Sequence, residues 1–192
     1  MKYIFASHNQ GKVNEMRHLF SDINWVGLSQ LTSEVPEETG STFVENALIK
    51  ARFAAKLSGL PAIADDSGLV VDALNGAPGV YAARYAGDDA NFDKNNQKLL
   101  REMQDVPEEN RGAYYVSVLV FLKHANDPLP KIATGLWHGS IYHKALGENG
   151  FGYDPVFWIP QYAKTVAQLD DEVKNKISHR AKAVGILKEL LK

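Results

Sequence analysis

The chain has 192 residues, of which 45% are hydrophobic, and its formal net charge at pH 7 is −2. This length fits one large domain or one domain with two lobes. A nearly balanced charge without a block of like charges argues against broad nucleic-acid binding and against an acidic tail. The absence of cysteine excludes disulfides, thiolate metal sites and cysteine nucleophiles.

The sequence also carries no sign of a membrane segment. It contains no run of about 18 apolar residues, so we expect no membrane span. The apolar run within residues 1–7 is too short for a signal peptide. We therefore expect a cytoplasmic protein.

The first part of the chain alternates strands and helices. Apolar residues at 3–6 predict a strand, and helical spacing of apolar residues predicts a helix at 12–20. The strongest predicted helix covers residues 42–58, where Thr42 and Glu45 match a capping box. The remaining predicted elements are, in chain order, strands at 25–28, 62–64 and 69–73, a helix at 91–103, strands at 114–123 and 132–141 that pair as an antiparallel hairpin, and a final helix at 178–191.

This order of elements predicts an α/β fold. Strands that alternate with helices, followed by a long hairpin, fit one long, mixed, twisted β-sheet with helices on its faces. The hairpin would build a second lobe. We therefore expect residues 1–192 to form a single two-lobed domain with a central active-site cleft.

The most informative segment is residues 63–69, where a short apolar run leads into two carboxylates, a hydroxyl and a glycine. A strand that ends in carboxylates suits Mg²⁺, which takes oxygen ligands. The same residues also suit a turn, because Asp and Ser bond the nearby backbone and Gly tolerates positive φ. Taken alone, the segment leaves both interpretations open.

A second candidate site lies between the first predicted strand and the helix that follows it. The free N–H groups of a helix N-terminus attract phosphates, and a lysine in the first turn adds a positive charge. The pattern is not a P-loop, because it lacks that motif's first glycine and the Ser or Thr after the lysine. A capped turn with a solvent-facing lysine explains the same residues. The segment consists of Ser7, His8, Asn9, Gln10, Gly11 and Lys12.

Three further segments place polar or aromatic side chains where a ligand could meet them. The loop before the strong helix holds two glutamates, and that helix holds an Asn–Lys pair four residues apart. A loop near residue 150 carries two aromatic rings, which either stack on a base or cover the core. Ser178 is a plausible N-cap for the last helix. The residues are Glu37, Glu38, Asn46, Lys50, Phe151, Gly152, Tyr153, Asp154, Lys174, His179 and Arg180.

Five motifs follow one another with fitting spacing. They are Ser-His-Asn-Gln-Gly-Lys from residue 7, Glu-Glu-Thr-Gly-Ser-Thr-Phe-Val-Glu-Asn-Ala from residue 37, Ala-Asp-Asp-Ser-Gly-Leu from residue 64, Gly-Phe-Gly-Tyr-Asp-Pro from residue 150 and Ile-Ser-His-Arg from residue 177. Together, over about residues 3–190, the chain resembles the inosine triphosphate pyrophosphatase family, which includes the bacterial dITP/XTP pyrophosphatases.

The resemblance implies an activity. It implies hydrolysis of noncanonical purine nucleoside triphosphates (dITP, ITP, XTP and dXTP) to the nucleoside monophosphate and pyrophosphate, which cleanses the nucleotide pool. It also implies a two-lobed α/β fold, a requirement for Mg²⁺ and a homodimer. The expected partner is a small-molecule nucleotide, and neither nucleic acid nor a membrane is expected.

The resemblance also implies a role for each motif. Asp66 is the expected catalytic carboxylate and metal ligand, helped by Glu37 or Glu38. Ser67 is expected to contact the substrate, as are Asn46 and Lys50. The segment from Ser7 to Lys12 is expected to cradle the triphosphate. The base and sugar side is expected to comprise Phe151, Gly152, Tyr153, Asp154, Lys174, His179 and Arg180, and we hypothesise that Arg180, with His179, binds the 6-oxo group of the purine.

Two other functions compete with this one. A non-catalytic nucleotide-binding protein with the same fold is disfavoured because Asp66 and Lys12 are both present. A pyrophosphatase for other modified nucleotides is disfavoured by the Ser-His-Arg and Phe-Gly-Tyr-Asp segments, which match the purine branch of the family.

Overall fold

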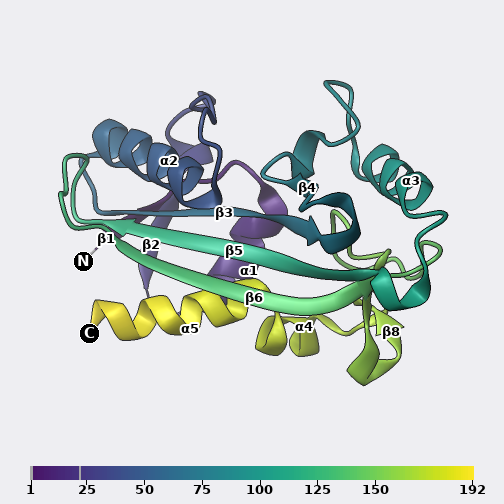
Figure 1. The fold of residues 1–192 in the computed structure, drawn as a ribbon. Helices are drawn as coiled ribbons and strands as arrows, with labels where there is room; N and C mark the ends of the chain where they lie inside the picture. Colours follow the sequence, from purple (N-terminus) through teal and green to yellow (C-terminus); the bar gives the residue numbers. More distant parts are fainter. Residues whose placement is uncertain (1, 22) are drawn as a thin grey trace. The chain divides into compact units, whose positions relative to one another are not determined.

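The computed structural model describes residues 2–21 and 23–192, so residues 1 and 22 of the predicted domain lie outside the described residues. Strands and helices alternate in the first half of the chain (Figure 1). The elements are β1 (Lys2–Phe5), α1 (Gln10–Leu19), β2 (Asn24–Gly27), α2 (Phe43–Ser58), β3 (Ala62–Val71), β4 (Pro78–Gly79), α3 (Phe92–Glu102), β5 (Gly112–Leu122), β6 (Lys131–Ile141), β7 (Phe157–Ile159), β8 (Lys164–Thr165), α4 (Asp171–Ile177) and α5 (His179–Leu191).

The strands belong to one mixed sheet, as predicted. Within the described residues the sheet has eight strands, in the order β2-β1-β3-β5-β6-β7-β8, and β4 pairs with β3. Strand β1 runs parallel to β2 and β3, whereas β3–β4, β6–β7 and β7–β8 are antiparallel pairs. None of the described helices is long and apolar enough to cross a lipid bilayer.

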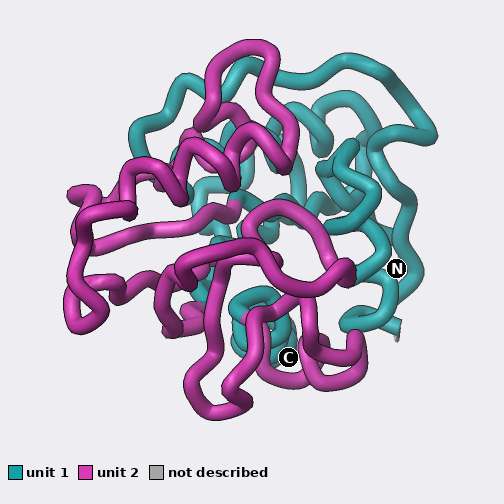
Figure 2. The backbone as a smooth tube through the Cα atoms, turned by 90° about the vertical axis from the view of Figure 1, so that its right-hand side faces the viewer, with its two compact units in different colours: residues 1–66, 117–135, 179–192 teal, residues 67–116, 136–178 magenta. Residues whose placement is uncertain are grey.

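The chain divides into two compact units (Figure 2). Unit 1 comprises Met1–Asp66, Ser117–Gly135 and His179–Lys192, and unit 2 comprises Ser67–Val116 and Leu136–Ser178. Three strands, β3, β5 and β6, contribute residues to both units.

In unit 1, helices lie on both faces of the sheet, α2 on one and α5 on the other (Figure 1). Helices α1 and α5 share a core cluster with the strands, formed by Val13 and Met16 of α1, Val184 of α5, and Phe5 and Ile63 of the sheet. Helix α2 buries a stripe of alanines, whose small side chains allow close packing. These are Ala47, Ala51, Ala54 and Ala55.

The predicted start and end of α2 are confirmed. The Thr42 side chain accepts a hydrogen bond from the Glu45 N–H, and the Glu45 carboxylate accepts one from the Thr42 N–H, which completes the capping box. Gly59 ends the helix in the left-handed conformation at φ 67°.

Strand β3 corrects the sequence analysis. The two short strands at 62–64 and 69–73 with an acidic turn between them were wrong, because residues 62–71 form one continuous strand. This strand lies between β1 and β5 in the sheet. Hydrogen bonding to two neighbouring strands and burial of both faces outweigh the local turn preference of Asp65, Asp66 and Ser67.

Unit 2 has a core of its own, rich in aromatic residues. The ring of Phe157 lies 4.5 Å from that of Tyr115 and 6.0 Å from that of Trp137, measured between ring centroids. Leu99 of α3 belongs to the same cluster, and Val173 of α4 packs against it. Helix α4 was not predicted from the sequence, whereas the predicted last helix is confirmed as α5.

Gly135 of β6 marks a close approach between the sheet and α5 in unit 1. A Cβ there would collide with the backbone oxygen of His179 and would lie 2.6 Å from the backbone nitrogen of Ala183. Gly185, within α5, has open space at the same atom position. The two glycines therefore form a matched pair for testing this packing.

We predict that Gly135→Ala lowers the free energy of unfolding by about 1–3 kcal/mol, because α5 must shift to admit the methyl group. Gly185→Ala should raise it by about 0.4–1 kcal/mol, because alanine restricts the unfolded chain. Urea unfolding of both variants and the wild type measures the difference. Equal stability of the two variants would contradict the packing described here.

Candidate active site

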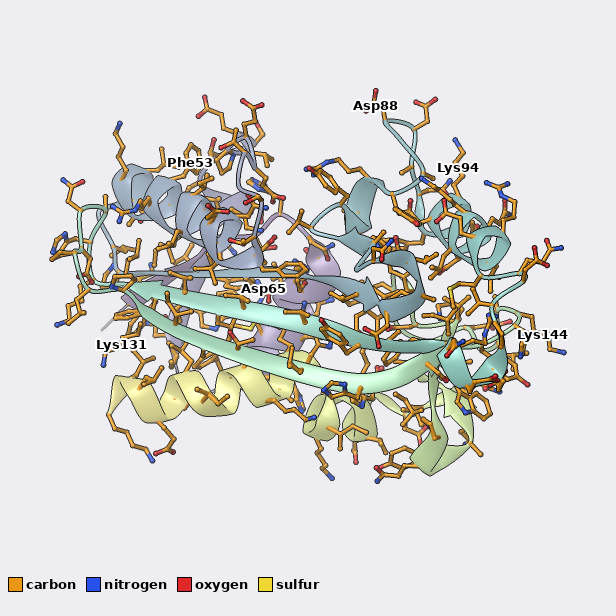
Figure 3. The ribbon with its side chains drawn as sticks, viewed as in Figure 1. Phe53, Asp65, Asp88, Lys94, Lys131 and Lys144 are labelled. Atoms are coloured by element: carbon orange, nitrogen blue, oxygen red, sulfur yellow. The ribbon has the colours of Figure 1, made fainter. Side chains whose placement is uncertain are left out.

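The candidate site is built on two consecutive carboxylates in β3, Asp65 and Asp66. Both residues are buried, with exposed fractions of 1% and 5%, and Asp65 is labelled on the strand in Figure 3. Successive side chains of a strand point to opposite faces of the sheet. Asp65 accordingly contacts residues of α1 and α5, and Asp66 contacts a residue of α2.

On the α2 face, Lys50 joins two carboxylates. Its Nζ donates to Oδ1 of Asp66 at 2.5 Å and to Oε1 of Glu38 at 3.1 Å. The side chains of Lys50 and Asp66 are only 11% and 7% exposed. Glu37 is exposed. Of the two glutamates that the sequence left open, the structure therefore brings Glu38 to Asp66.

The charges of this group depend on one another. Burial raises the pKa of the Asp66 carboxyl, and the Lys50 ammonium offsets this rise only in part. Burial alone would lower the pKa of Lys50, but the Asp66 and Glu38 carboxylates together raise it. Lys50 is therefore held as a cation between the two carboxylates.

The second oxygen of Asp66 is chemically available. Oδ2 is buried and has no hydrogen-bond partner within the described residues. An unsatisfied buried carboxylate oxygen is unfavourable in a fold at rest. It suits an atom that accepts a proton from water or binds a cation when a substrate is present.

On the opposite face, Asp65 is saturated with donors. Its Oδ2 lies 2.9 Å from Lys12 Nζ and 3.2 Å from a terminal nitrogen of Arg180, and its Oδ1 accepts from Ser117 Oγ at 2.6 Å. Arg180 also pairs with Glu15 of α1. These contacts tie α1, β3, β5 and α5 together in unit 1.

Electrostatics favour the charged forms of Asp65 and Arg180 in this second group, whereas burial opposes the charge of Lys12. Burial alone would raise the pKa of Asp65, but Arg180 and Lys12 hold it well below its ordinary value. Burial lowers the pKa of the Lys12 ammonium more than Asp65 raises it. For Arg180, burial is outweighed by Asp65 and Glu15, which raise the pKa of the guanidinium.

The segment from Ser7 to Lys12 caps α1 and forms its first turn, and its lysine does not face solvent. Asn9 is the N-cap of α1, and its Oδ1 accepts from the Lys12 N–H at 3.1 Å. The Lys12 side chain is 16% exposed and lies against Asp65. The other residues keep their polar groups near the surface: Ser7 Oγ accepts from the Asn9 N–H, His8 Nε2 lies 2.8 Å from the Thr32 carbonyl, Gln10 donates to Asn14, and Gly11 is in the first turn.

In unit 2, Asp154 organises the loop that carries the predicted base-binding residues. Its Oδ1 accepts from the Tyr115 hydroxyl at 3.1 Å, and its Oδ2 accepts from Lys174 Nζ at 2.7 Å and from the Phe151 N–H at 2.9 Å. Lys174 Nζ also lies 4.7 Å from the centre of the Phe151 ring. Gly150 is required here, because its φ is 77° and a Cβ would collide with Asp154.

The two aromatic residues of this loop have different positions. Tyr153 is a buried core residue whose hydroxyl donates to the Ala82 carbonyl at 2.7 Å. Phe151 is partly exposed, and its ring contacts Phe92 at 6.2 Å between centroids. Phe151 is therefore the ring that is able to meet a ligand. Gly152 is held by its carbonyl, which accepts from Asn96 Nδ2 at 2.9 Å.

The remaining predicted residues lie on these same elements. Ser67 follows Asp66 in β3 and is partly buried, and Asn46 of α2 is fully buried. His179 and Arg180 begin α5 in unit 1 and are 6% and 1% exposed. Both side chains are therefore buried, although they lie in the first turn of a helix.

Sequence reasoning assigned no role to several residues of the site. Asp65 was recognised only as part of the acidic segment, although the alternation of a strand would have separated it from Asp66. Glu15 follows Lys12 by three residues on α1, a helical neighbour spacing that signals a shared face. Ser117 and Asn96 carried no local signal, because each reaches its partner, Asp65 in unit 1 and Gly152 in unit 2, through sheet pairing or tertiary packing.

The metal-binding capacity of the site rests on few ligands. The described residues contain no cluster of three or more His, Cys, Asp or Glu side chains that could hold a metal ion. Asp66 and Glu38 nevertheless share one cation, Lys50, and Asp66 retains an unpaired oxygen. Such a pair fits Mg²⁺, which commonly binds one or two carboxylates plus substrate phosphates.

A sequence profile of the Ham1 family matches residues 3–190. The chain is 55% identical to a protein from Haemophilus influenzae named dITP/XTP pyrophosphatase, over 99% of this chain and 98% of that protein. It is 52% identical to a protein of the same name from Pseudomonas syringae pv. tomato, over 98% and 95% of the two chains.

Solved structures with the same fold also match. A HAM1 protein from Coxiella burnetii superposes with a TM-score of 0.92 at 45% identity, covering 100% of this chain and 98% of that one. A protein from Mycobacterium abscessus described as a nucleoside-triphosphatase and dITP/XTP pyrophosphatase superposes with a TM-score of 0.78 at 43% identity, covering 97% and 98%.

Proposed function

The chain belongs to the Ham1 family, and we propose that it is a nucleoside triphosphate pyrophosphatase. It hydrolyses noncanonical purine nucleoside triphosphates, such as dITP and XTP, to the monophosphate and pyrophosphate. The proposal rests on full-length relatives of that name at above 50% identity. It rests equally on the buried carboxylate of Asp66, which has one oxygen bound by Lys50 and one oxygen unpaired.

The observation that carries the proposal is the state of Asp66. Its carboxylate is buried, held at Oδ1 by Lys50 and unpaired at Oδ2. A carboxylate fixed at one oxygen and free at the other is positioned to orient a water molecule and accept its proton. We propose that Asp66 activates the water that attacks the triphosphate.

Positive charge near the phosphates is the second requirement. Phosphoryl transfer depends mainly on positioning and charge neutralisation. We propose that Lys12, at the N-terminus of α1, and Lys50 bind phosphate oxygens, and that the backbone of the segment from Ser7 to Lys12 adds N–H donors. Although the two lysines pair with different aspartates, Lys12 is close enough to the Lys50 group for Lys50 to lower its pKa. Mg²⁺, when bound, supplies further charge neutralisation at the phosphates, and Asp66 and Glu38 are its proposed ligands.

The loop that carries Phe151 is proposed to serve the base of the substrate. Phe151 offers a partly exposed ring for stacking, and Lys174 a cation beside it. Asp154, Gly152 and Tyr153 act by fixing the loop, since their polar groups are already engaged.

Three assignments stay predictions. Arg180, with His179, is predicted to bind the 6-oxo group, although Asp65 and Glu15 hold its guanidinium in unit 1. Ser67 and Asn46 are predicted substrate contacts. The homodimer, the cytoplasmic location and the single two-lobed domain are also proposals. A cytoplasmic location agrees with a substrate drawn from the nucleotide pool.

The reaction is tested by pyrophosphate release with Mg²⁺ from dITP, XTP, dATP, dGTP and dTTP. We predict release from dITP and XTP, and a loss of about 10²–10⁴-fold in Asp66→Asn, the usual contribution of a general base. Asp88→Asn, which changes an exposed carboxylate of unit 2 (Figure 3), is the control and should keep full activity.

Two results would overturn the proposal. Full activity in Asp66→Asn would remove Asp66 from the chemistry. Tight binding of dITP without release of pyrophosphate from any nucleotide would identify a nucleotide-binding protein instead of an enzyme.

A second prediction concerns pH. Lys50 lowers the pKa of Asp66 and so opposes the rise caused by burial. Without this ammonium the pKa of Asp66 rises further, and the ionised base is lost at a higher pH. In Lys50→Gln the acidic limb of the kcat/KM profile for dITP should therefore move to higher pH.

Lys56→Gln, an exposed lysine of the same helix, provides the control and should keep the wild-type profile. An acidic limb that stays in place in Lys50→Gln would show that Asp66 is not the group that titrates.

A further inference from the structure

Glu38 reaches Lys50 and Asp66 from a loop, residues 36–41, that contains no helix or strand. A loop holds a side chain in place only if its backbone is fixed by other contacts. The Glu38 side chain itself is 25% exposed, so packing around it is incomplete. Contacts of the loop backbone therefore contribute to the position of Glu38.

Two contacts with α2 fix the loop: Ser41 donates its N–H and hydroxyl to the Glu45 carboxylate, and the backbone N–H of Gly40, two residues after Glu38, binds Asn46. The Gly40 N–H donates to Oδ1 of Asn46 at 2.8 Å. Asn46 is fully buried in α2, one helical turn before Lys50. The same short stretch of α2 thus holds the loop through Asn46 and meets its glutamate through Lys50.

Gly40 fits tightly against this helix. A Cβ at Gly40 would lie 2.5 Å from the Cβ of Glu45 and 2.7 Å from Oδ1 of Asn46. Only a glycine allows the loop backbone to approach Asn46 so closely. The contact therefore requires a glycine at residue 40, and its acceptor is the side-chain oxygen of Asn46.

Packing alone does not explain an asparagine at this position. Its Nδ2 is buried and has no hydrogen-bond partner among the described residues, and an unmet buried donor is destabilising. An apolar residue would avoid this cost in a helix that otherwise buries alanines. What the Asn46 carboxamide adds is the hydrogen bond that its Oδ1 accepts from the Gly40 N–H.

We propose that Asn46 is a positioning residue: by binding the Gly40 N–H it places Glu38 beside Lys50 and Asp66 and so completes the carboxylate pair for a divalent cation. This inference rests on the proposed function. It is an alternative to the predicted substrate contact of Asn46, because here Asn46 acts through Glu38 and not on the substrate.

A double-mutant cycle tests this role. Asn46→Ala should raise the Mg²⁺ concentration for half-maximal activity by about 10- to 100-fold, as loss of outer-shell support for metal ligands commonly does. In a Glu38→Gln background the same change should have an effect of roughly twofold or less, because the residue on which it acts is gone. Gly40→Ala breaks the contact from the loop side and should behave like Asn46→Ala, without altering a buried residue.

Hydrogen exchange gives a readout that needs neither metal nor activity. The Gly40 amide should exchange roughly 2- to 10-fold faster in Asn46→Ala, the factor expected from one ordinary hydrogen bond. Ser58→Ala, which removes a side-chain bond at the other end of α2, is the control and should change neither Gly40 exchange nor the Mg²⁺ dependence.

The outcomes separate two failures. Wild-type protein that releases no pyrophosphate would overturn the proposed function. An active wild type in which Asn46→Ala has the same effect with and without Glu38 would overturn the positioning role alone. Unchanged Gly40 exchange in Asn46→Ala would also overturn it.

Discussion

The site depends on one constraint, the two-residue period of a β-strand. Because Asp65 and Asp66 are consecutive in β3, their side chains leave opposite faces of the sheet. Each face then supplies different cations: Lys12 and Arg180 meet Asp65, and Lys50 meets Asp66. A slip of one residue in the pairing of β3 would exchange these partners. Ile4 of the neighbouring strand β1 pairs with Ala62 of β3, and this pairing helps to fix the register.

The two carboxylates have different tasks because their surroundings differ. Asp65 has donors on both oxygens, and its pKa lies well below the ordinary value. It works as a structural anion that holds α1, β5 and α5 to β3 in unit 1. Asp66 has one unpaired oxygen and a raised pKa, which suits a group that exchanges protons or ligands. Removing one partner of a buried ion pair commonly costs about 3–5 kcal/mol of stability. Substitution of either aspartate or of its cationic partners is therefore expected to destabilise the fold.

Much of the fold follows from local signals. The capping box of Thr42 and Glu45 is local, and it predicted the start of α2 correctly. The acidic segment was misjudged because its turn preference is local, whereas its strand conformation comes from β1 and β5 on either side. Helix α4 is short and gave too weak a periodic signal.

The site was predictable in its residue types more than in their arrangement. The choice between Glu37 and Glu38 required the position of Lys50, which is distant in sequence. The sequence left open whether Tyr153 stacks on a base or covers the core; the structure buries it in the core of unit 2, and its place beside the base stays a prediction. Such distinctions arise from tertiary packing, and no local pattern encodes them.

The most direct test of this account is a carbon-detected NMR titration of the Asp65 and Asp66 carboxyl groups in the wild-type protein. The account predicts opposite shifts, with the pKa of Asp65 below and the pKa of Asp66 above the ordinary aspartate value of about 3.9. Two carboxyl groups that titrate together, or whose pKa values shift in the same direction, would contradict the division of roles between the two faces of β3.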